Sequence, residues 1–115
     1  MEKDVIKKQL LEMLGPDIVL TQDIDLMYYS YDSSFFTKLT PLSPSAVVLP
    51  RSVEDVQKVM RFAYQNKVNV IPHGAGTGET GGCVAIEGGI ILDLSSWNDI
   101  VEIDAPNMQV IVRPG

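Results

Sequence analysis

The sequence predicts an α+β domain in which an N-terminal helix is followed by a β-α-β-β-β arrangement. Three observations predict it: an amphipathic stretch lies between two short apolar stretches, the glycines concentrate in one segment, and two alternating segments flank a turn. The chain has 115 residues, the usual size of one domain, and 45% of them are hydrophobic. These values are typical of a folded globular chain.

The charge balance and the cysteine count exclude several classes of protein. The net charge is −6 at pH 7, so no broad basic surface is expected for nucleic acid or anionic lipid. The single cysteine, Cys83, excludes an internal disulfide and fits a reducing compartment. No apolar run reaches the length of a membrane span, and no signal peptide is visible. We therefore expect a cytoplasmic protein with no nucleic-acid partner and no membrane span.

The first expected element is a short amphipathic helix over residues 2–14, which Gly15-Pro16 ends. Its apolar face carries Ile6, Leu10, Met13 and Leu14. Residues 21–45 show no steady period, so an irregular packed segment is expected there. Its aromatic residues are expected to pad the edge of the core: Tyr28, Tyr29, Tyr31, Phe35 and Phe36. Residues 1–45 are thus expected to form one N-terminal helix and an irregular aromatic segment.

A β-α-β unit is expected next. Residues 46–49 predict a short buried strand that Pro50 ends, and residues 68–71 predict the following strand. Between them, Ser52 is the expected N-cap of a helix with acidic residues in its first turn. The apolar stripe of this helix is Val53, Val56, Val59, Met60 and Ala63. Strands joined in this way usually pair side by side in parallel, which is the arrangement predicted here.

The last elements follow the glycine-rich segment. Residues 89–94 predict a buried strand, and Trp97 is expected to cap its end. Residues 100–104 and 109–112 alternate in polarity around a turn, which predicts an antiparallel hairpin with one solvated face. The acidic side chains expected on that solvated face are Asp99, Glu102 and Asp104.

The glycine-rich segment, residues 71–82, is the strongest indication of function. Glycines at 74, 76 and 78 can take positive φ without cost and turn consecutive backbone N–H groups toward one anion. A Walker A loop is excluded because Gly-Lys-Ser/Thr is missing, and a Rossmann loop is excluded because no helix opens at the glycines. Two interpretations remain open: a diphosphate-binding loop held by amides, or a conformationally demanding loop without a ligand.

Three segments of the chain carry a family resemblance. Residues 47–56, residues 70–78 and the Gly81-Gly82 pair resemble the FAD-linked oxidases of the vanillyl-alcohol oxidase superfamily, which share a PCMH-type FAD-binding domain. The branch that contains glycolate oxidase subunit GlcD and D-lactate dehydrogenase is the most similar, and the Tyr31-Asp32 stretch and the Val110–Gly115 ending are similar to that branch too. The likeness runs from about Tyr28 to Gly115. It implies that residues 46–115 are the first FAD-binding subdomain and that the second subdomain and the cap are absent.

The resemblance also implies a cofactor site. In relatives that attach the flavin through a loop histidine, that residue falls where this sequence has Thr77, so non-covalent FAD is expected. Many relatives have arginine at the position of His73, the only histidine, which is expected to shape the loop or contact the cofactor. The residues expected to bind FAD are Pro50, His73, Gly74, Ala75, Gly76, Thr77, Gly78, Thr80, Gly81 and Gly82.

The function implied is that of the FAD-binding N-terminal portion of a 2-hydroxy-acid oxidoreductase of the glycolate or D-lactate type. No catalytic residue is expected in this chain, because the family's catalytic base lies C-terminal to the matched region. Expected partners are the C-terminal half of the flavoprotein and oxidase-complex subunits that carry electrons onward. Apolar surface meant for that half predicts self-association of the isolated chain. The alternatives are a non-catalytic nucleotide- or partner-binding remnant, or part of another FAD-linked enzyme such as a MurB-like reductase.

The remaining reactive residues are expected to be structural. Cys83 is interpreted as a small packing residue because no base is identifiable near it. The spacing of Asp23, Asp25 and Asp32 matches no calcium loop, so solvated loop carboxylates are expected. No metal site is predicted.

Overall fold

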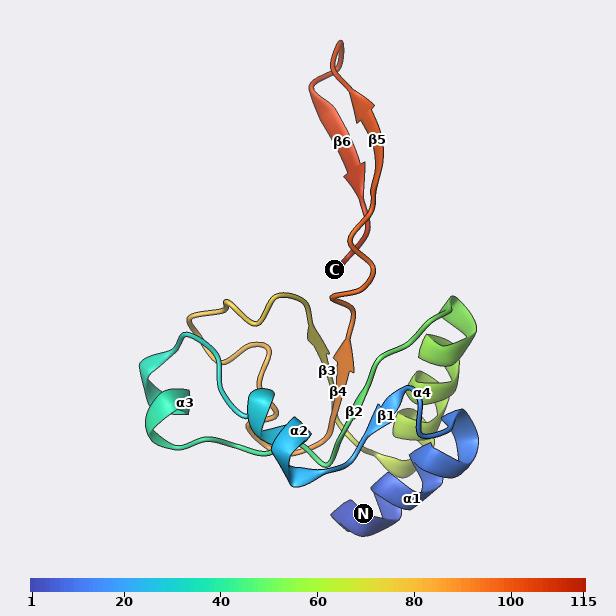
Figure 1. The fold of residues 1–115 in the computed structure, drawn as a ribbon, viewed down its shortest axis with the longest axis vertical. Helices are drawn as coiled ribbons and strands as arrows, with labels where there is room; N and C mark the ends of the chain where they lie inside the picture. The colour runs from blue at the N-terminus through green and yellow to red at the C-terminus, as the bar shows by residue number, and fades with distance from the viewer.

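The computed structural model describes all 115 residues, from Met1 to Gly115, and confirms the α+β class. A four-stranded sheet in the order β1-β2-β4-β3 forms the body, and a two-stranded hairpin, β5-β6, projects from it (Figure 1). The elements are α1 (Lys3–Leu14), β1 (Val19–Leu20), α2 (Asp23–Tyr28), α3 (Phe35–Leu39), β2 (Ala46–Val48), α4 (Val53–Asn66), β3 (Val70–His73), β4 (Ile90–Asp93), β5 (Ile100–Asp104) and β6 (Gln109–Val112).

The N-terminal helix α1 forms as predicted and packs on the sheet. Ile6 and Leu10 are buried among residues of β1, β2 and β4, and Gly15 ends the helix at a φ of 87°. The strand that follows, β1, was not predicted. It pairs antiparallel with β2 through Val19 and Val48. A two-residue strand carries no period, so only its pairing in the fold identifies it.

Helix α4 begins at the predicted cap. Ser52 Oγ accepts from the Asp55 N–H at 3.2 Å, and Asp55 Oδ2 accepts in return from the Ser52 N–H at 3.2 Å. Val59 and Ala63 are buried against the sheet. The predicted stripe is too wide, since Val53 and Met60 are exposed. Only the residues of the stripe that face the sheet are buried by contacts within this chain.

The strands on either side of α4 are parallel but not adjacent, so the predicted side-by-side pairing is wrong. Strand β4 lies between them and pairs in parallel with both: Val47 and Ile71 each face Ile91. All four residues of β4 are buried. A strand that is apolar on both faces is most stable at the centre of a sheet, where both faces are covered. Strand β4 therefore takes the central position, and β3 lies at the edge.

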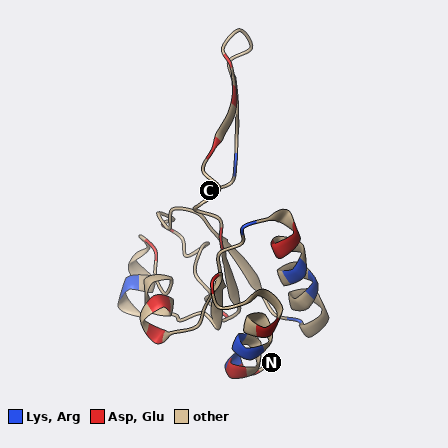
Figure 2. Cartoon of the chain, turned by 45° about the vertical axis from the view of Figure 1, so that its right-hand side comes forward, with Lys and Arg blue, Asp and Glu red and all other residues tan.

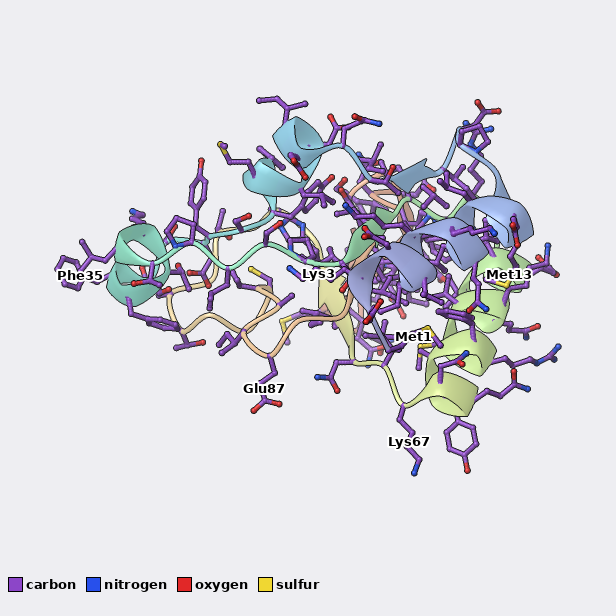
Figure 3. The ribbon with its side chains drawn as sticks, turned by 90° about the horizontal axis from the view of Figure 1, so that it is seen from below. Met1, Lys3, Met13, Phe35, Lys67 and Glu87 are labelled. Atoms are coloured by element: carbon purple, nitrogen blue, oxygen red, sulfur yellow. The ribbon has the colours of Figure 1, made fainter.

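Residues 21–45 are more regular than predicted, because they contain the short helices α2 and α3. The expectation that their aromatic residues pad the core holds for one of the five, because Tyr29 packs with Leu26 and Val47 in a core cluster. Tyr29 is buried, whereas Tyr28, Tyr31, Phe35 and Phe36 are exposed. Phe35 points outward from α3 at the far edge of the molecule (Figure 3). Helices of one or two turns are too short to show a helical period in the sequence.

The hairpin β5-β6 is antiparallel, as predicted, with Ile103 facing Val110. The prediction of a single solvated face is wrong. Every residue of β6 is exposed, and β5 is exposed from Ile100 to Ile103. In Figure 1 the hairpin extends away from the sheet, and no other element lies along it.

Charged residues are spread along the chain rather than gathered on one element. Lys and Arg lie on several elements, among them α1 and α4, while acidic residues follow the hairpin and the short N-terminal helices (Figure 2). This distribution agrees with the absence of a basic surface expected from the net charge of −6. None of the helices has both the length and the apolar character needed to cross a bilayer.

Candidate functional site

The candidate site lies at the carboxyl edge of the parallel strands β2, β4 and β3. Pro50 follows β2, and the glycine-rich loop, residues 74–82, follows β3. Because β2 and β3 flank β4, these two strands are about 10 Å apart. This edge of an open α/β sheet is where ligands usually bind. The topology therefore brings Pro50 and the loop to one side of the sheet.

The end of β2 is tied to the segment that follows β4. The Trp97 indole N–H donates to the Pro50 carbonyl at 2.8 Å, and the Trp97 backbone N–H donates to the Leu94 carbonyl at 2.8 Å. Trp97 thus caps β4, as predicted. The chain also returns here after the hairpin, since the Gly115 N–H donates to the Trp97 carbonyl at 2.8 Å.

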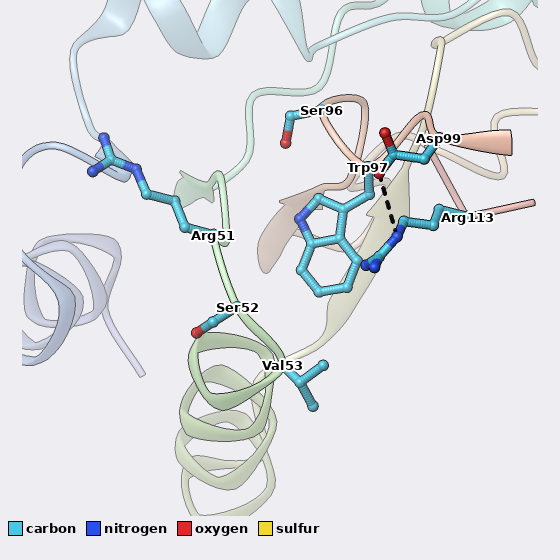
Figure 4. Close-up of a pocket in the computed structure, with 7 residues that line it drawn as sticks. All are labelled: Arg51, Ser52, Val53, Ser96, Trp97, Asp99 and Arg113. Atoms are coloured by element: carbon cyan, nitrogen blue, oxygen red, sulfur yellow. Dashed lines mark ion pairs between the residues drawn. The ribbon is translucent and has the colours of Figure 1, made fainter. Parts of the chain in front are cut away.

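A pocket of about 430 Å³ lies beside this junction, at the N-terminal end of α4 (Figure 4). Trp97 forms part of its wall, and Arg113 Nε pairs with Asp99 Oδ2 at 3.3 Å across one side. Arg51 also contributes, but its side chain points away from the other labelled residues. No sequence motif marks this pocket, because its residues come from segments far apart in the chain.

The backbone amides of the glycine-rich loop are the main feature of the site. No N–H group from Gly74 to Thr80 donates a hydrogen bond within the chain. The predicted conformation is only partly correct: Gly76 has a φ of 69°, whereas Gly74 and Gly78 do not have positive φ. The loop is a run of free donors shaped by a positive φ at Gly76 and another at Gly81.

His73 supports the start of this loop from inside. The residue is buried, and its Nδ1 lies 3.0 Å from the Gly74 carbonyl oxygen. A Cβ on Gly76 would lie 3.0 Å from His73 Nε2, a tight contact, so glycine is favoured there by space as well as by φ. The position fits the loop-shaping role considered for His73.

Two buried side chains under the loop were not predicted to act together. The Tyr29 hydroxyl donates to Asp93 Oδ2 at 2.5 Å, and the Tyr29 ring meets the His73 ring edge-on at 5.0 Å between centroids. Burial, reinforced by the Asp93 carboxylate, raises the pKa of Tyr29 above its ordinary value. The phenol therefore stays protonated and fixes the end of β4 beneath the loop.

Asp32 contradicts its predicted role as a solvated carboxylate, because it is only 3% exposed. Its Oδ1 accepts from the Ser34 N–H at 2.8 Å, from the Ser34 hydroxyl and from the Thr37 hydroxyl at 2.8 Å. Its Oδ2 accepts from the Gly81 N–H at 2.8 Å. The Ser34 hydroxyl, with the other donors, lowers the pKa of Asp32 to about 2 against the cost of burial. The carboxylate is charged and bound to the glycine-rich loop.

A smaller pocket of about 280 Å³ adjoins the loop on the side of α2 and α3. Lys38 and Tyr31 line it together with Gly76. Lys38 is thus a cation near the loop that no pattern in the sequence predicts there. Cys83 is half-buried, with its Sγ 3.9 Å from Asp32 Oδ2, a position consistent with packing.

Comparisons with known proteins give consistent results. Residues 44–115 match a family described as an FAD binding domain. The chain is 34% identical over 113 residues to the glycolate oxidase subunit GlcD of Bacillus subtilis, covering 98% of this chain and 23% of that protein. It is also 34% identical over 113 residues to the mitochondrial D-lactate dehydrogenase (cytochrome) of Arabidopsis thaliana, covering 96% and 20% respectively.

A solved structure of alkyldihydroxyacetonephosphate synthase shares the fold, with a TM-score of 0.75, 19% identity, and coverage of 97% of this chain and 24% of that one. The chain therefore spans less than a quarter of the length of these relatives. The region matched to the family contains Pro50 and the glycine-rich loop. Asp32 and the elements α1 to α3 precede that region.

Proposed function

The chain belongs to the FAD-binding domain family, its cofactor is FAD, and we propose that the glycine-rich loop holds the FAD diphosphate without a covalent bond. The observation that carries this proposal is the run of free N–H groups from Gly74 to Thr80 at the carboxyl edge of the sheet. The residues that we propose to line the cofactor are Pro50, His73, Gly74, Ala75, Gly76, Thr77, Gly78, Thr80, Gly81 and Gly82.

The chemistry of the loop fits a diphosphate. Phosphate oxygens accept several hydrogen bonds at once, and adjacent amides that point into one concavity supply them without a basic side chain. Thr77 and Thr80 are exposed and add hydroxyl donors. Glycines let the ligand approach the backbone closely. The Gly81 N–H is already bound to Asp32, so Gly81 would contribute by its shape rather than by that donor.

We infer that residues 46–115 form the first FAD-binding subdomain and that residues 1–45 are a segment packed against it. FAD, when bound, supplies the acceptor for the electrons of the substrate. The named relatives are a glycolate oxidase subunit and a D-lactate dehydrogenase, which favours a short 2-hydroxy acid as the substrate of the whole protein. The side chains of this chain bind and orient the cofactor, and none of them is assigned a catalytic step.

The longer relatives also favour a larger assembly. We propose that further polypeptide supplies the second FAD-binding subdomain, the substrate cap and the catalytic base, and that it covers the exposed hairpin β5-β6. Subunits of an oxidase complex would then take electrons from the flavin, and we propose a cytoplasmic location for this assembly.

Titration of the purified chain with FAD, ADP and riboflavin tests the diphosphate site. FAD and ADP should bind and compete with one another, because both carry a diphosphate, whereas riboflavin, which lacks one, should bind far more weakly. Binding of riboflavin as tight as that of FAD would contradict a diphosphate nest. Fluorescence quenching and calorimetry report these affinities directly.

The variant Gly76→Ala provides a test within the loop. It forces a side chain into a φ of 69° and toward His73, so FAD affinity should fall by about tenfold or more. Gly88→Ala is the matched control, because Gly88 has a φ of 74° and open space around its Cβ position. The control should carry the same kind of backbone strain and keep its affinity for FAD. Equal losses of affinity in both variants would show that general destabilisation, not the loop, is responsible.

A further inference from the structure

Residues 30–37 lie against the second half of the glycine-rich loop and are joined to it by two hydrogen bonds. The Ser33 N–H donates to the Gly78 carbonyl at 2.8 Å. The Gly81 N–H donates to Asp32 Oδ2 at 2.8 Å. These contacts hold both ends of the turn from Gly78 to Gly81. They come from residues outside the region that matches the FAD binding domain.

The Asp32 carboxylate is itself fixed from the opposite side. Its other oxygen, Oδ1, accepts from the backbone and hydroxyl of Ser34 and from the hydroxyl of Thr37. The side chain is buried and forms no ion pair with Lys or Arg. A buried carboxylate without a cation depends on its hydrogen-bond donors, so each donor is held in place by the charge it solvates. Asp32 is therefore a rigid anchor for the loop.

The environment of Gly81 completes the arrangement. Gly81 has a φ of 78°, and a Cβ there would lie 2.6 Å from Phe36 Cζ and 3.2 Å from Ile86 Cδ1. Its N–H is turned inward to Asp32, while the N–H groups from Gly74 to Thr80 have no acceptor in the chain. The anchor thus uses one amide of the loop and leaves the preceding ones free.

We propose that Asp32 is a positioning residue that fixes the turn from Gly78 to Gly81 and thereby presents the free amides of the loop to the FAD diphosphate. This inference rests on the function proposed above. A loop that is ordered before binding loses less conformational freedom when the ligand arrives, and its affinity is correspondingly higher. Removing the anchor leaves the ligand to order the loop.

The variant Asp32→Asn is the direct test. A carboxamide has one acceptor oxygen and one NH₂ donor, so it cannot accept hydrogen bonds from both Gly81 and Ser34. FAD affinity should fall by about tenfold or more, because the ligand must then order the turn that Asp32 otherwise holds. Asp23→Asn is the matched control, because Asp23 is an exposed acid at the start of α2. It carries the same change in charge and should bind FAD as the unmodified chain does.

Amide hydrogen exchange supplies a readout that does not depend on the variant or on FAD. In the unmodified chain without ligand, the Gly81 amide should exchange at least about tenfold more slowly than the Gly76 amide, which has no acceptor. Exchange of Gly81 as fast as that of Gly76 would overturn the inference. So would an Asp32→Asn chain that folds and binds FAD with unchanged affinity.

The same measurements separate this inference from the proposed function. If the chain binds no FAD but its Gly81 amide is protected, the proposed diphosphate site is contradicted, while the hydrogen bond by which Asp32 holds the loop is supported. If the chain binds FAD but its Gly81 amide is unprotected, the diphosphate site is supported and the positioning role of Asp32 is overturned. If Asp32→Asn fails to fold, the exchange of Gly81 in the unmodified chain decides the inference.

Discussion

At the scale of single residues, buried polar side chains hold the glycine-rich loop from beneath. His73 occupies the space next to Gly76, Tyr29 binds Asp93 under the loop, and Asp32 binds Gly81. Glycine spacing alone indicates that the loop can adopt a tight turn, whereas these contacts determine which backbone conformation it adopts. In that conformation the amides from Gly74 to Thr80 have no acceptor within the chain.

The sequence could predict the loop but not its supports. The pattern of glycines and threonines is local, so a tight loop able to bind an anion could be proposed from it. The bond between Asp32 and Gly81 joins residues 49 positions apart. An aspartate in a polar segment looks the same whether it is solvated or buried, so only the fold distinguishes the two.

Asp32 should also shape the acid stability of the chain. Its pKa is about 2 in the folded state and 3.8 ordinarily, so its bonds stabilise the fold fully above pH 3.8. That contribution is lost as the pH falls from 3.8 toward 2, because the unfolded chain takes up the proton first. Urea unfolding from neutral pH down to about pH 2 should show a steeper acid decline in the unmodified chain than in Asp32→Asn. Identical acid declines, with Asp23→Asn as the control, would contradict this role.

At the scale of elements, length and periodicity determine which helices and strands can be predicted from the sequence. Helices α1 and α4, with 12 and 14 residues, show clear apolar stripes and recognisable ends. Strand β1 and helices α2 and α3 have two, six and five residues, too few for a period to emerge. Strand order was also beyond local patterns, because the central place of β4 results from its burial on both faces.

The packing of α1 makes a prediction about the N-terminal segment. Leu10 is fully buried in the cluster that includes β2 and β4, although α1 precedes the region matched to the family. Leu10→Ala should therefore lower the free energy of unfolding by about 3 kcal/mol, as expected for a core leucine. Val5→Ala, at an exposed position of the same helix, should cost about 0.5 kcal/mol or less. Urea unfolding measures both, and similar small losses would mean that α1 is only loosely attached.

At the scale of the whole molecule, the chain is less compact than its length requires. Its radius of gyration is 15.2 Å, with extents of 52 × 35 × 23 Å. A compact domain of this length would have a radius of gyration of about 13 Å. The projecting hairpin accounts for the long axis in Figure 1. Its β-branched residues are exposed on both faces, so within this chain the hairpin presents an apolar surface to solvent.

The two edges of the hairpin differ in charge. Strand β5 carries Glu102 and Asp104, whereas β6, from Gln109 to Val112, carries no charge. Uncharged, exposed edge strands rich in β-branched residues readily pair with another strand. In the isolated chain, a second copy is the available partner. We therefore expect concentration-dependent self-association that begins at the β6 edge.

The double variant Ile103→Glu/Val110→Lys tests this expectation without weakening the hairpin. The two residues face one another across the strands and are 67% and 56% exposed, so the new charges can pair with each other while making the surface polar. Sedimentation velocity over a wide concentration range should show association of the unmodified chain and a monomer for the variant. Tyr64→Lys removes an exposed aromatic from α4, away from the hairpin, and should leave the association unchanged. Association that persists in the double variant would show that the contact lies outside the hairpin. An unmodified chain that stays monomeric at every concentration would contradict self-association through the hairpin.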